Sequence, residues 1–291
     1  MKKTHTHTTL QKIIFLIESL SSSELLSRTL MELWMSGYEA ERIPIGQIMT
    51  SAPAHGTDTH PLAKRLLVVT DRADIASRCL QRGVAVIGYL HEQSRNASFN
   101  GVHYLIEDIS GLDVSFCELA FCRAHQLPYM VFETKRCLVR EITTEDVPRL
   151  YEIYAEPSIT NYIEALYADE AAERSYIRDY IDNVYGFYGY GMWIVVNKED
   201  GQVIGRAGIE PKEDFAELGY VIAREYQNQG YATEVCSAIL EYAADRLSLP
   251  EVYVRVQKEN AASLRICEKL KFQPVSHPED SDMLVFTLRL N

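Results

Sequence analysis

The segment 217–233 contains the residue types and spacing that best suit this chain to hold an anion. Its pattern is typical of a short strand, a turn and the start of a helix, and helix starts attract anions because their N–H groups are unpaired. Gly230 has no side chain to keep a diphosphate away from these donors, and Ala232 is nearly as small. We therefore predict a phosphate site formed by Gln227, Asn228, Gln229, Gly230, Tyr231, Ala232 and the hydroxyl of Thr233.

The residues on either side predict the two elements that position this turn. Leu218, Tyr220 and Ile222 occupy alternate positions before it, which is typical of a strand. After the turn, apolar residues recur at helical spacing and form one stripe, made by Ala232, Val235, Cys236, Ile239, Tyr242 and Ala243. This helix is expected to pack on a sheet while its N-terminus points at the ligand.

The part of the chain from Cys137 onward resembles the GNAT acetyltransferases, in the branch that includes the ribosomal-protein N-terminal acetyltransferases. The order of its predicted elements agrees with that family, including a hairpin of strands 192–197 and 202–209. The resemblance is carried by Glu217-Leu-Gly-Tyr, Gln229-Gly-Tyr-Ala-Thr-Glu and Asn260-Ala-Ala-Ser263. It implies an α+β domain with a mixed, splayed central sheet, and acetyl-CoA as cosubstrate.

The resemblance also assigns roles around the cofactor. The family holds the pantetheine arm along the strand that is here Tyr220, Val221 and Ile222, and further cofactor contacts are expected at Asn260 and Ser263. An amine acceptor must lose a proton before it attacks, and a carboxylate can take that proton. Glu217 is the predicted base and Glu210 the second candidate; the alternative is that Glu217 is a surface carboxylate.

The thiolate that leaves acetyl-CoA needs a proton, and the residue that supplies it is the next one to identify. Many relatives place a tyrosine seven residues after the motif asparagine, but here that position is Cys267. Ser263 is the predicted substitute acid, and the alternative is a simple cofactor contact or helix hydroxyl. A second departure is Lys271, where the family usually has glycine before Phe272. An acceptor pocket is expected to draw on aromatic residues, which are Tyr162, Tyr167, Tyr176, Tyr180, Tyr185, Tyr188, Tyr190 and Trp193.

Composition narrows the class of partner. The chain has 291 residues and a net charge of −12, and residues 136–291 hold 16 Lys and Arg against 27 Asp and Glu, a net charge of −11. Such acidity argues against nucleic acid and suits a cationic amine, although it is equally consistent with solubility alone. No apolar run approaches the length of a membrane span, and no signal peptide is expected, so we predict a cytoplasmic protein. The oligomeric state stays open.

The cysteines and the N-terminal histidines show no pattern typical of a redox or metal site. The six cysteines form no Cys-x-x-Cys pair, which favours reduced thiols. His5 and His7 alternate with threonines but have no accompanying carboxylate or cysteine, so no metal site is predicted.

A boundary is expected near residues 127–136, where Pro128 ends a helical pattern and the charge balance shifts. We predict an N-terminal domain at 1–132 and the acetyltransferase domain at 135–291. The first is expected to begin with a helix at 10–20 and a second helix capped by Ser22 or Ser23, whose apolar face is Leu25, Leu26, Leu30, Leu33 and Trp34. A βαβ pattern at 65–90, a strand at 104–106 and a helix at 114–125 then predict a small parallel, Rossmann-like sheet.

Residues 65–130 resemble the C-terminal part of a haloacid-dehalogenase-like domain. The resemblance rests on Val68-Val69-Thr70-Asp71 and on Val86-Ile87-Gly88. The family's Asp-x-Asp nucleophile is not found upstream, so we expect this domain to be non-catalytic. Asp71 follows a strand and either holds a cation or ligand or caps the next helix.

Taken together, the residues and the resemblances predict an α/β protein with two domains. Its predicted activity is transfer of acetyl from acetyl-CoA to a primary amine by direct attack, where the acceptor is a small cationic amine or a protein N-terminus. The alternative is a non-catalytic acyl-CoA sensor or interaction module.

Overall fold

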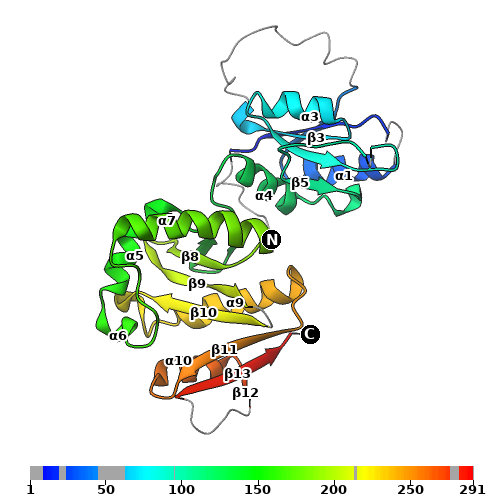
Figure 1. Ribbon diagram of the computed structural model, residues 1–291. Helices are drawn as coiled ribbons and strands as arrows, with labels where there is room; N and C mark the ends of the chain where they lie inside the picture. Colours follow the sequence, from blue (N-terminus) through cyan, green and yellow to red (C-terminus); the bar gives the residue numbers. More distant parts are fainter. Residues whose placement is uncertain are drawn as a thin grey trace. The chain divides into compact units, whose positions relative to one another are not determined.

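The computed structural model describes residues 9–19, 24–44, 63–94, 96–212, 215–275 and 282–290. The chain divides into two compact units, Met1–Tyr129 and Met130–Asn291, and each is built on its own sheet (Figure 1). No helix in the described part of the chain is both long and apolar enough to cross a lipid bilayer.

The first unit is a parallel, doubly wound sheet, as the alternating pattern predicts. Its strands lie in the order β2-β1-β3-β4-β5, with bounds Glu39–Arg42, Lys12–Leu16, Leu66–Thr70, Ala85–Tyr89 and Tyr104–Ile106. Residues of α1 (Glu24–Met35) and α4 (Val114–Ala124) share one core cluster with Leu67 and Ile87. Residues of α3 (Ala73–Leu80) pack with Val68 and Val86. Successive residues of a strand face opposite sides of the sheet, so α1 and α4 lie on one face and α3 lies on the other.

The predicted helix at 10–20 is wrong, because this segment contains the strand β1. Ile13 and Phe15 are buried in the core cluster under α1 and α4, whereas Leu16 belongs to the cluster on the other face. A strand buried on both faces has a continuous apolar run, which periodicity cannot distinguish from a buried helix.

The predicted second helix is confirmed as α1, although its proposed caps Ser22 and Ser23 lie outside the described residues. Its buried stripe is Leu26, Thr29 and Leu33. Trp34 is 69% exposed and Leu25 is 38% exposed, so the predicted apolar face was wrong at these two positions.

The second unit is built on a mixed eight-stranded sheet in the order β12-β13-β11-β10-β9-β8-β7-β6. The bounds of β6 to β10 are Met130–Glu133, Cys137–Arg140, Met192–Asn197, Val203–Pro211 and Ala216–Ile222. Those of β11 to β13 are Glu251–Gln257, Gln273–Pro274 and Met283–Arg289. The predicted hairpin is β8 and β9, which pair antiparallel, with Gly201 in the turn at φ 70°.

The helices of this unit pack on the sheet. They are α5 (Val147–Tyr154), α6 (Pro157–Thr160), α7 (Glu170–Tyr180), α9 (Tyr231–Asp245) and α10 (Ala261–Lys269). A π-turn at Ile181–Tyr185 links α7 to the short α8 (Gly186–Tyr188). The core cluster runs from Leu150 and Ile177 through Ile204 and Ala207 to Val235 and Ile239, so one apolar interior joins the sheet to α5, α7 and α9.

Candidate active site

A groove of about 470 Å³ lies at the start of α9. Every residue predicted to bind the cofactor lines it except Gln229, whose side chain instead donates to the carbonyl of Glu225. Gln227 also contributes to the loop itself, because its amide donates to the carbonyl of Ile222 at 2.9 Å. Arg265 and Lys269 of α10 line the same groove, which places two cations near any phosphate bound there. These two residues were missed from sequence.

The loop depends on its glycine for conformation more than for space. Gly230 is the N-cap of α9 with φ 84°, in the left-handed region that side chains disfavour. A Cβ added there would meet its nearest neighbour, Arg136, at an ordinary 3.6 Å. The left-handed residue ends the turn and lets α9 begin with its unpaired N–H groups at the groove.

Arg136 is a third residue that the sequence did not indicate. Its Nε donates to Glu234 at 2.6 Å, and another guanidinium nitrogen donates to the carbonyl of Gln229 at 2.9 Å. The guanidinium also stacks on the ring of Tyr231, 4.0 Å from its centroid. This cation lies in the turn between β6 and β7 and fixes the turn at the start of α9, nearly one hundred residues later, so no local pattern could have indicated it.

The strands on the far side of the groove diverge. In the described residues, the parallel pair β10 and β11 has one register pair, Glu217 with Tyr253. Beyond it, Tyr220, Val221 and Ile222 pair with β9 and line the groove on their other side. An open strand edge of this kind can present backbone donors to a ligand.

Two hydroxyl groups meet where the groove ends. The phenol of Tyr220 donates to the hydroxyl of Ser263 at 3.0 Å. Asn260 holds the serine in place, because its side chain caps α10 by accepting from the Ser263 N–H at 3.1 Å. Burial raises the pKa of Tyr220 well above its usual value, so the phenol keeps its proton at neutral pH. Cys267, at the position where relatives have tyrosine, is buried in the core, and burial raises the pKa of its thiol to about 11.

The two candidate bases are both ion-paired. Glu217 accepts from the Arg255 guanidinium with both oxygens, at 2.8 and 2.7 Å. Glu210 pairs with Lys212 at 2.8 Å. Glu217 lies directly opposite Glu210 in the sheet, so both carboxylates lie on one face.

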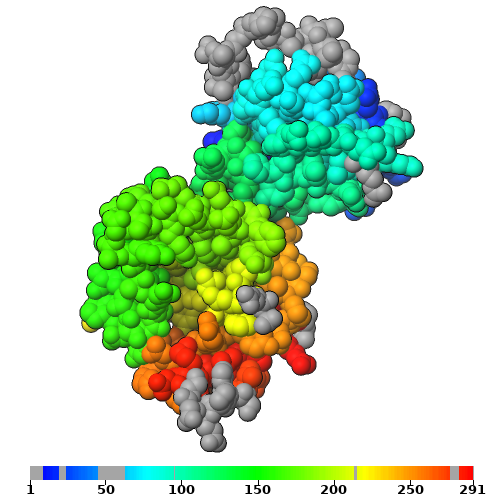
Figure 2. Space-filling view, viewed as in Figure 1, coloured from blue at the N-terminus to red at the C-terminus, as the bar shows by residue number. Residues whose placement is uncertain are grey.

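A second cavity, of about 810 Å³, lies on this face of the sheet. It is bounded by the segment 162–167, by α7 and by strands β9 to β11. Figure 2 shows the hollow, with the yellow β10 region recessed between the green segment that carries α6 and α7 and the orange segment that carries β11. The groove and this cavity share a wall, made by Tyr162, Ile163, Tyr220, Val221, Asn260 and Ser263.

Three of the eight aromatic residues expected in an acceptor pocket lie together at the second cavity. Tyr162, Tyr167 and Tyr176 line the second cavity. Tyr185 and Trp193 are instead fully buried in the core, where their size fills space between sheet and helices. The others, Tyr180, Tyr188 and Tyr190, do not line this cavity.

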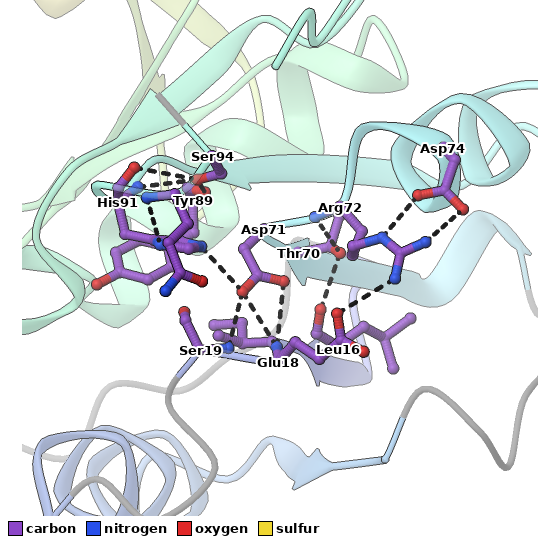
Figure 3. Close-up of polar contacts among 12 residues, drawn as sticks. Leu16, Glu18, Ser19, Thr70, Asp71, Arg72, Asp74, Tyr89, His91 and Ser94 are labelled. Carbon is purple, nitrogen blue, oxygen red and sulfur yellow. Dashed lines mark hydrogen bonds and ion pairs between the residues drawn. The ribbon is translucent and has the colours of Figure 1, made fainter. Parts of the chain in front are cut away.

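In the first unit, Asp71 forms a buried polar cluster at the ends of three strands (Figure 3). Its carboxylate accepts from the backbone N–H groups of Glu18 and Ser19 and pairs with His91 at 3.3 Å. The predicted helix cap is wrong, because α3 begins after Arg72 with no side-chain cap. Through these contacts Asp71 joins the loops that follow β1, β3 and β4.

Neither a metal site nor a disulfide is present among the described residues. The described residues contain no group of three or more His, Cys, Asp or Glu able to hold a metal ion. None of the six cysteines forms a disulfide, and five of them are buried. His5 and His7 lie outside the described residues.

Comparison with known families finds matches to the second unit. A profile described as "Acetyltransferase (GNAT) domain" matches residues 136–273. The uncharacterized N-acetyltransferase YnaD of Bacillus subtilis is 31% identical over 144 residues, which are 48% of this chain and 81% of that relative. The uncharacterized N-acetyltransferase YoaA of the same species is 28% identical over 154 residues, covering 50% and 84%.

Solved structures give similar matches. An acetyltransferase from Agrobacterium tumefaciens is 24% identical with a TM-score of 0.47, over 54% of this chain and 93% of that one. A putative ribosomal-protein-serine acetyltransferase from Vibrio cholerae is 20% identical with a TM-score of 0.46, over 54% and 95%.

Proposed function

This chain belongs to the GNAT family of acetyltransferases, whose cosubstrate is acetyl-CoA, and we propose that its second unit transfers the acetyl group to a primary amine by direct attack. The observation that carries the proposal is the shared wall between the two cavities. A cofactor in the groove and an amine in the second cavity would meet at Tyr220, Val221 and Ser263, without any need for an acyl-enzyme.

The groove suits the cofactor by its chemistry. The N–H groups at the start of α9 can receive the diphosphate, with Arg136 beside them and Arg265 and Lys269 across the groove. The open edge at Tyr220–Ile222 can receive the amide-bearing arm and polarise the thioester carbonyl.

For proton transfer we propose Glu217 as the base and the Tyr220–Ser263 pair as the acid. The Arg255 ion pair orients the Glu217 carboxylate at the second cavity, where each oxygen keeps a further lone pair for the amine or a water molecule. Ser263 receives its hydrogen bond from Tyr220, so its own proton is available to the departing sulfur.

The direct test is thiol release from acetyl-CoA in the presence of a panel of amines. Amine-dependent release establishes transfer. Tight acetyl-CoA binding with no amine-dependent release would instead favour a sensor, which the buried Cys267 and the ion-paired Glu217 would suit.

We propose that the first unit, Met1–Tyr129, is haloacid-dehalogenase-like and does not catalyse, and that the second unit, Met130–Asn291, is an autonomous transferase. The expected bounds, 1–132 and 135–291, would separate strand β6 from the sheet to which it belongs. The parallel sheet and the internally bonded Asp71 support the first point. A protein N-terminus stays among the acceptors under this proposal. Six cysteines without a disulfide support a reducing, cytoplasmic setting.

A further inference from the structure

Arg206 is a buried cation without a partner in the described structure. The residue is 8% exposed, and its Nε is buried with no hydrogen-bond acceptor. Among the residues that the structure describes, no carboxylate lies within ion-pair distance of its guanidinium. Arg206 nevertheless lines the second cavity, so a molecule bound there can reach it.

Its position in the sheet places Arg206 beside the predicted site of transfer. It lies on β9 directly opposite Val221 of β10, a residue of the shared wall. Directly opposite residues of an antiparallel pair share one face, with Cβ atoms about 5 Å apart. Burial lowers the pKa of Arg206, but the nearby phenols of Tyr154, Tyr185, Tyr180 and Tyr176 raise it, and the pKa ends above its usual value.

Of the other charged residues that line this cavity, four form ion pairs with one another, and Glu164 is exposed to solvent. Glu217 is paired with Arg255, and Glu210 with Lys212. The remaining one is Glu173 of α7, which is 1% exposed. Its Oε2 accepts from the N–H of Tyr167, but its Oε1 is buried and has no partner. The cavity therefore offers one buried cation and one buried acceptor that the protein itself does not satisfy.

Burying an ion without a partner is costly, so such groups are retained where a ligand completes them. A guanidinium matches the planar, bidentate geometry of a carboxylate. We propose that the acceptor is a primary amine that also carries a carboxylate, of the amino-acid class, with its carboxylate on Arg206 and one of its hydrogen-bond donors on Glu173. This proposal rests on the proposed acetyl transfer and names its substrate class.

The same geometry disfavours polyamines. The acidic balance of residues 136–291 would attract them at long range, but the buried charge beside the shared wall is positive. An acceptor without an anionic group would leave the guanidinium desolvated and unpaired.

The first experiment needs no variant. Thiol release from acetyl-CoA is measured with glycine, phenylalanine, lysine and glutamate, with the amide of each, and with spermidine. Each acid is expected to exceed its own amide by about 10- to 100-fold in kcat/KM, the range for a hydrogen bond to a charged group. Equal rates for acids and amides, or a preference for spermidine, would overturn the substrate class while leaving acetyl transfer intact.

The second experiment removes the cation. Arg206→Met is expected to equalise each acid with its amide, whereas Arg206→Lys restores part of the preference. Arg174→Met is the matched control, because that arginine is paired with Glu170 on the outer side of α7. Thermal unfolding and acetyl-CoA titration show whether each variant is folded. A preference for acids that persists in Arg206→Met refutes the assignment to Arg206, and absence of release with every amine refutes the transfer proposal itself.

Discussion

The phenol of Tyr220 donates a hydrogen bond to the hydroxyl of Ser263, which joins the open strand β10 to the first turn of α10. The contact lies on the wall that separates the cofactor groove from the acceptor cavity. This chain therefore has two linked hydroxyl groups at the wall. The position at which many relatives have a tyrosine is Cys267 here, and this residue is buried in the core.

Tyr220→Phe tests the linked pair. Removing the phenol leaves the Ser263 hydroxyl without its donor, so turnover is expected to fall by about 10²-fold, the lower range for positioned proton transfer. Acetyl-CoA affinity, measured by titration calorimetry, should change little because the ring remains. Ser263→Ala should give a similar loss, and the double variant should lose no more than either single variant. Independent, multiplying losses would contradict a shared role.

Glu217→Gln tests the base. The amide keeps the shape of the side chain but cannot accept a proton, so turnover at neutral pH is expected to fall about 10²-fold with acetyl-CoA affinity unchanged. The matched control is Glu210→Gln on the neighbouring strand, which should retain most of the activity. If Glu210→Gln carries the loss and Glu217→Gln does not, the roles are reversed.

Gly230→Ala tests the left-handed turn at the start of α9. A side chain at φ 84° is expected to cost about 1–2 kcal/mol and to weaken acetyl-CoA binding by turning donors away from the groove. Gly186→Ala is the control, since Gly186 has a helical φ of −64° and nothing closer than 3.9 Å to an added Cβ. Gly230→Glu adds bulk and like charge and should abolish binding. Calorimetry that finds parental affinity in Gly230→Glu would remove the loop from the cofactor site.

The ion pair of Arg136 and Glu234 predicts an acid-sensitive loop. Burial alone would raise the pKa of Glu234, but hydrogen bonds from Thr134 and Arg136 outweigh it and hold this pKa below its usual value. The resulting stability is complete above the unfolded pKa, near 4.5, and is lost as the pH falls through the folded value. Urea unfolding should show Glu234→Gln destabilised by about 1–2 kcal/mol at pH 7, allowing for partial exposure of Arg136. The variant and the parent should converge as the pH falls below 4.5, and a constant difference would contradict this account.

Two fragments test whether the transferase unit is autonomous. Strand β6 is the edge of its sheet, and Phe132 contacts the rings of Trp193 and Tyr242. A fragment of residues 130–291 is expected to fold and bind acetyl-CoA. A fragment of residues 135–291 loses β6 and should be less stable by about 2–4 kcal/mol, since a large aromatic contact is removed. If neither fragment binds acetyl-CoA, the two units fold as one cooperative body.

The sequence predicted the elements of the groove because the contacts that form them join residues only a few positions apart. The turn at Gly230, the helix that follows it and the Asn260 cap each depend on residues within a few positions. Lys271, which stands where relatives have glycine, keeps the expected turn by adopting a left-handed φ of 64°. Sequence indicated this departure but could not show that the backbone tolerates it.

The residues that sequence could not predict act across the fold. Arg136 reaches a helix start 98 residues away. Arg206 is unusual because its buried Nε has no acceptor among the residues that the structure describes, and only the packed fold reveals this. Strand β1 was misread for a related reason. Its apolar run fits a strand buried on both faces and a buried helix equally well, and only its pairing with β2 and β3 distinguishes the two.

The single rung between β10 and β11 has a thermodynamic consequence. The half-sheet of β11, β13 and β12 is joined to the rest by a short ladder, and the gap beyond Glu217 leaves strand edge unpaired on the side of the groove. A bound cofactor that fills this gap would act as an added strand between the two halves. Occupancy and folding stability are then linked by mass action, so the melting temperature should rise with acetyl-CoA concentration and report how much of the protein is loaded.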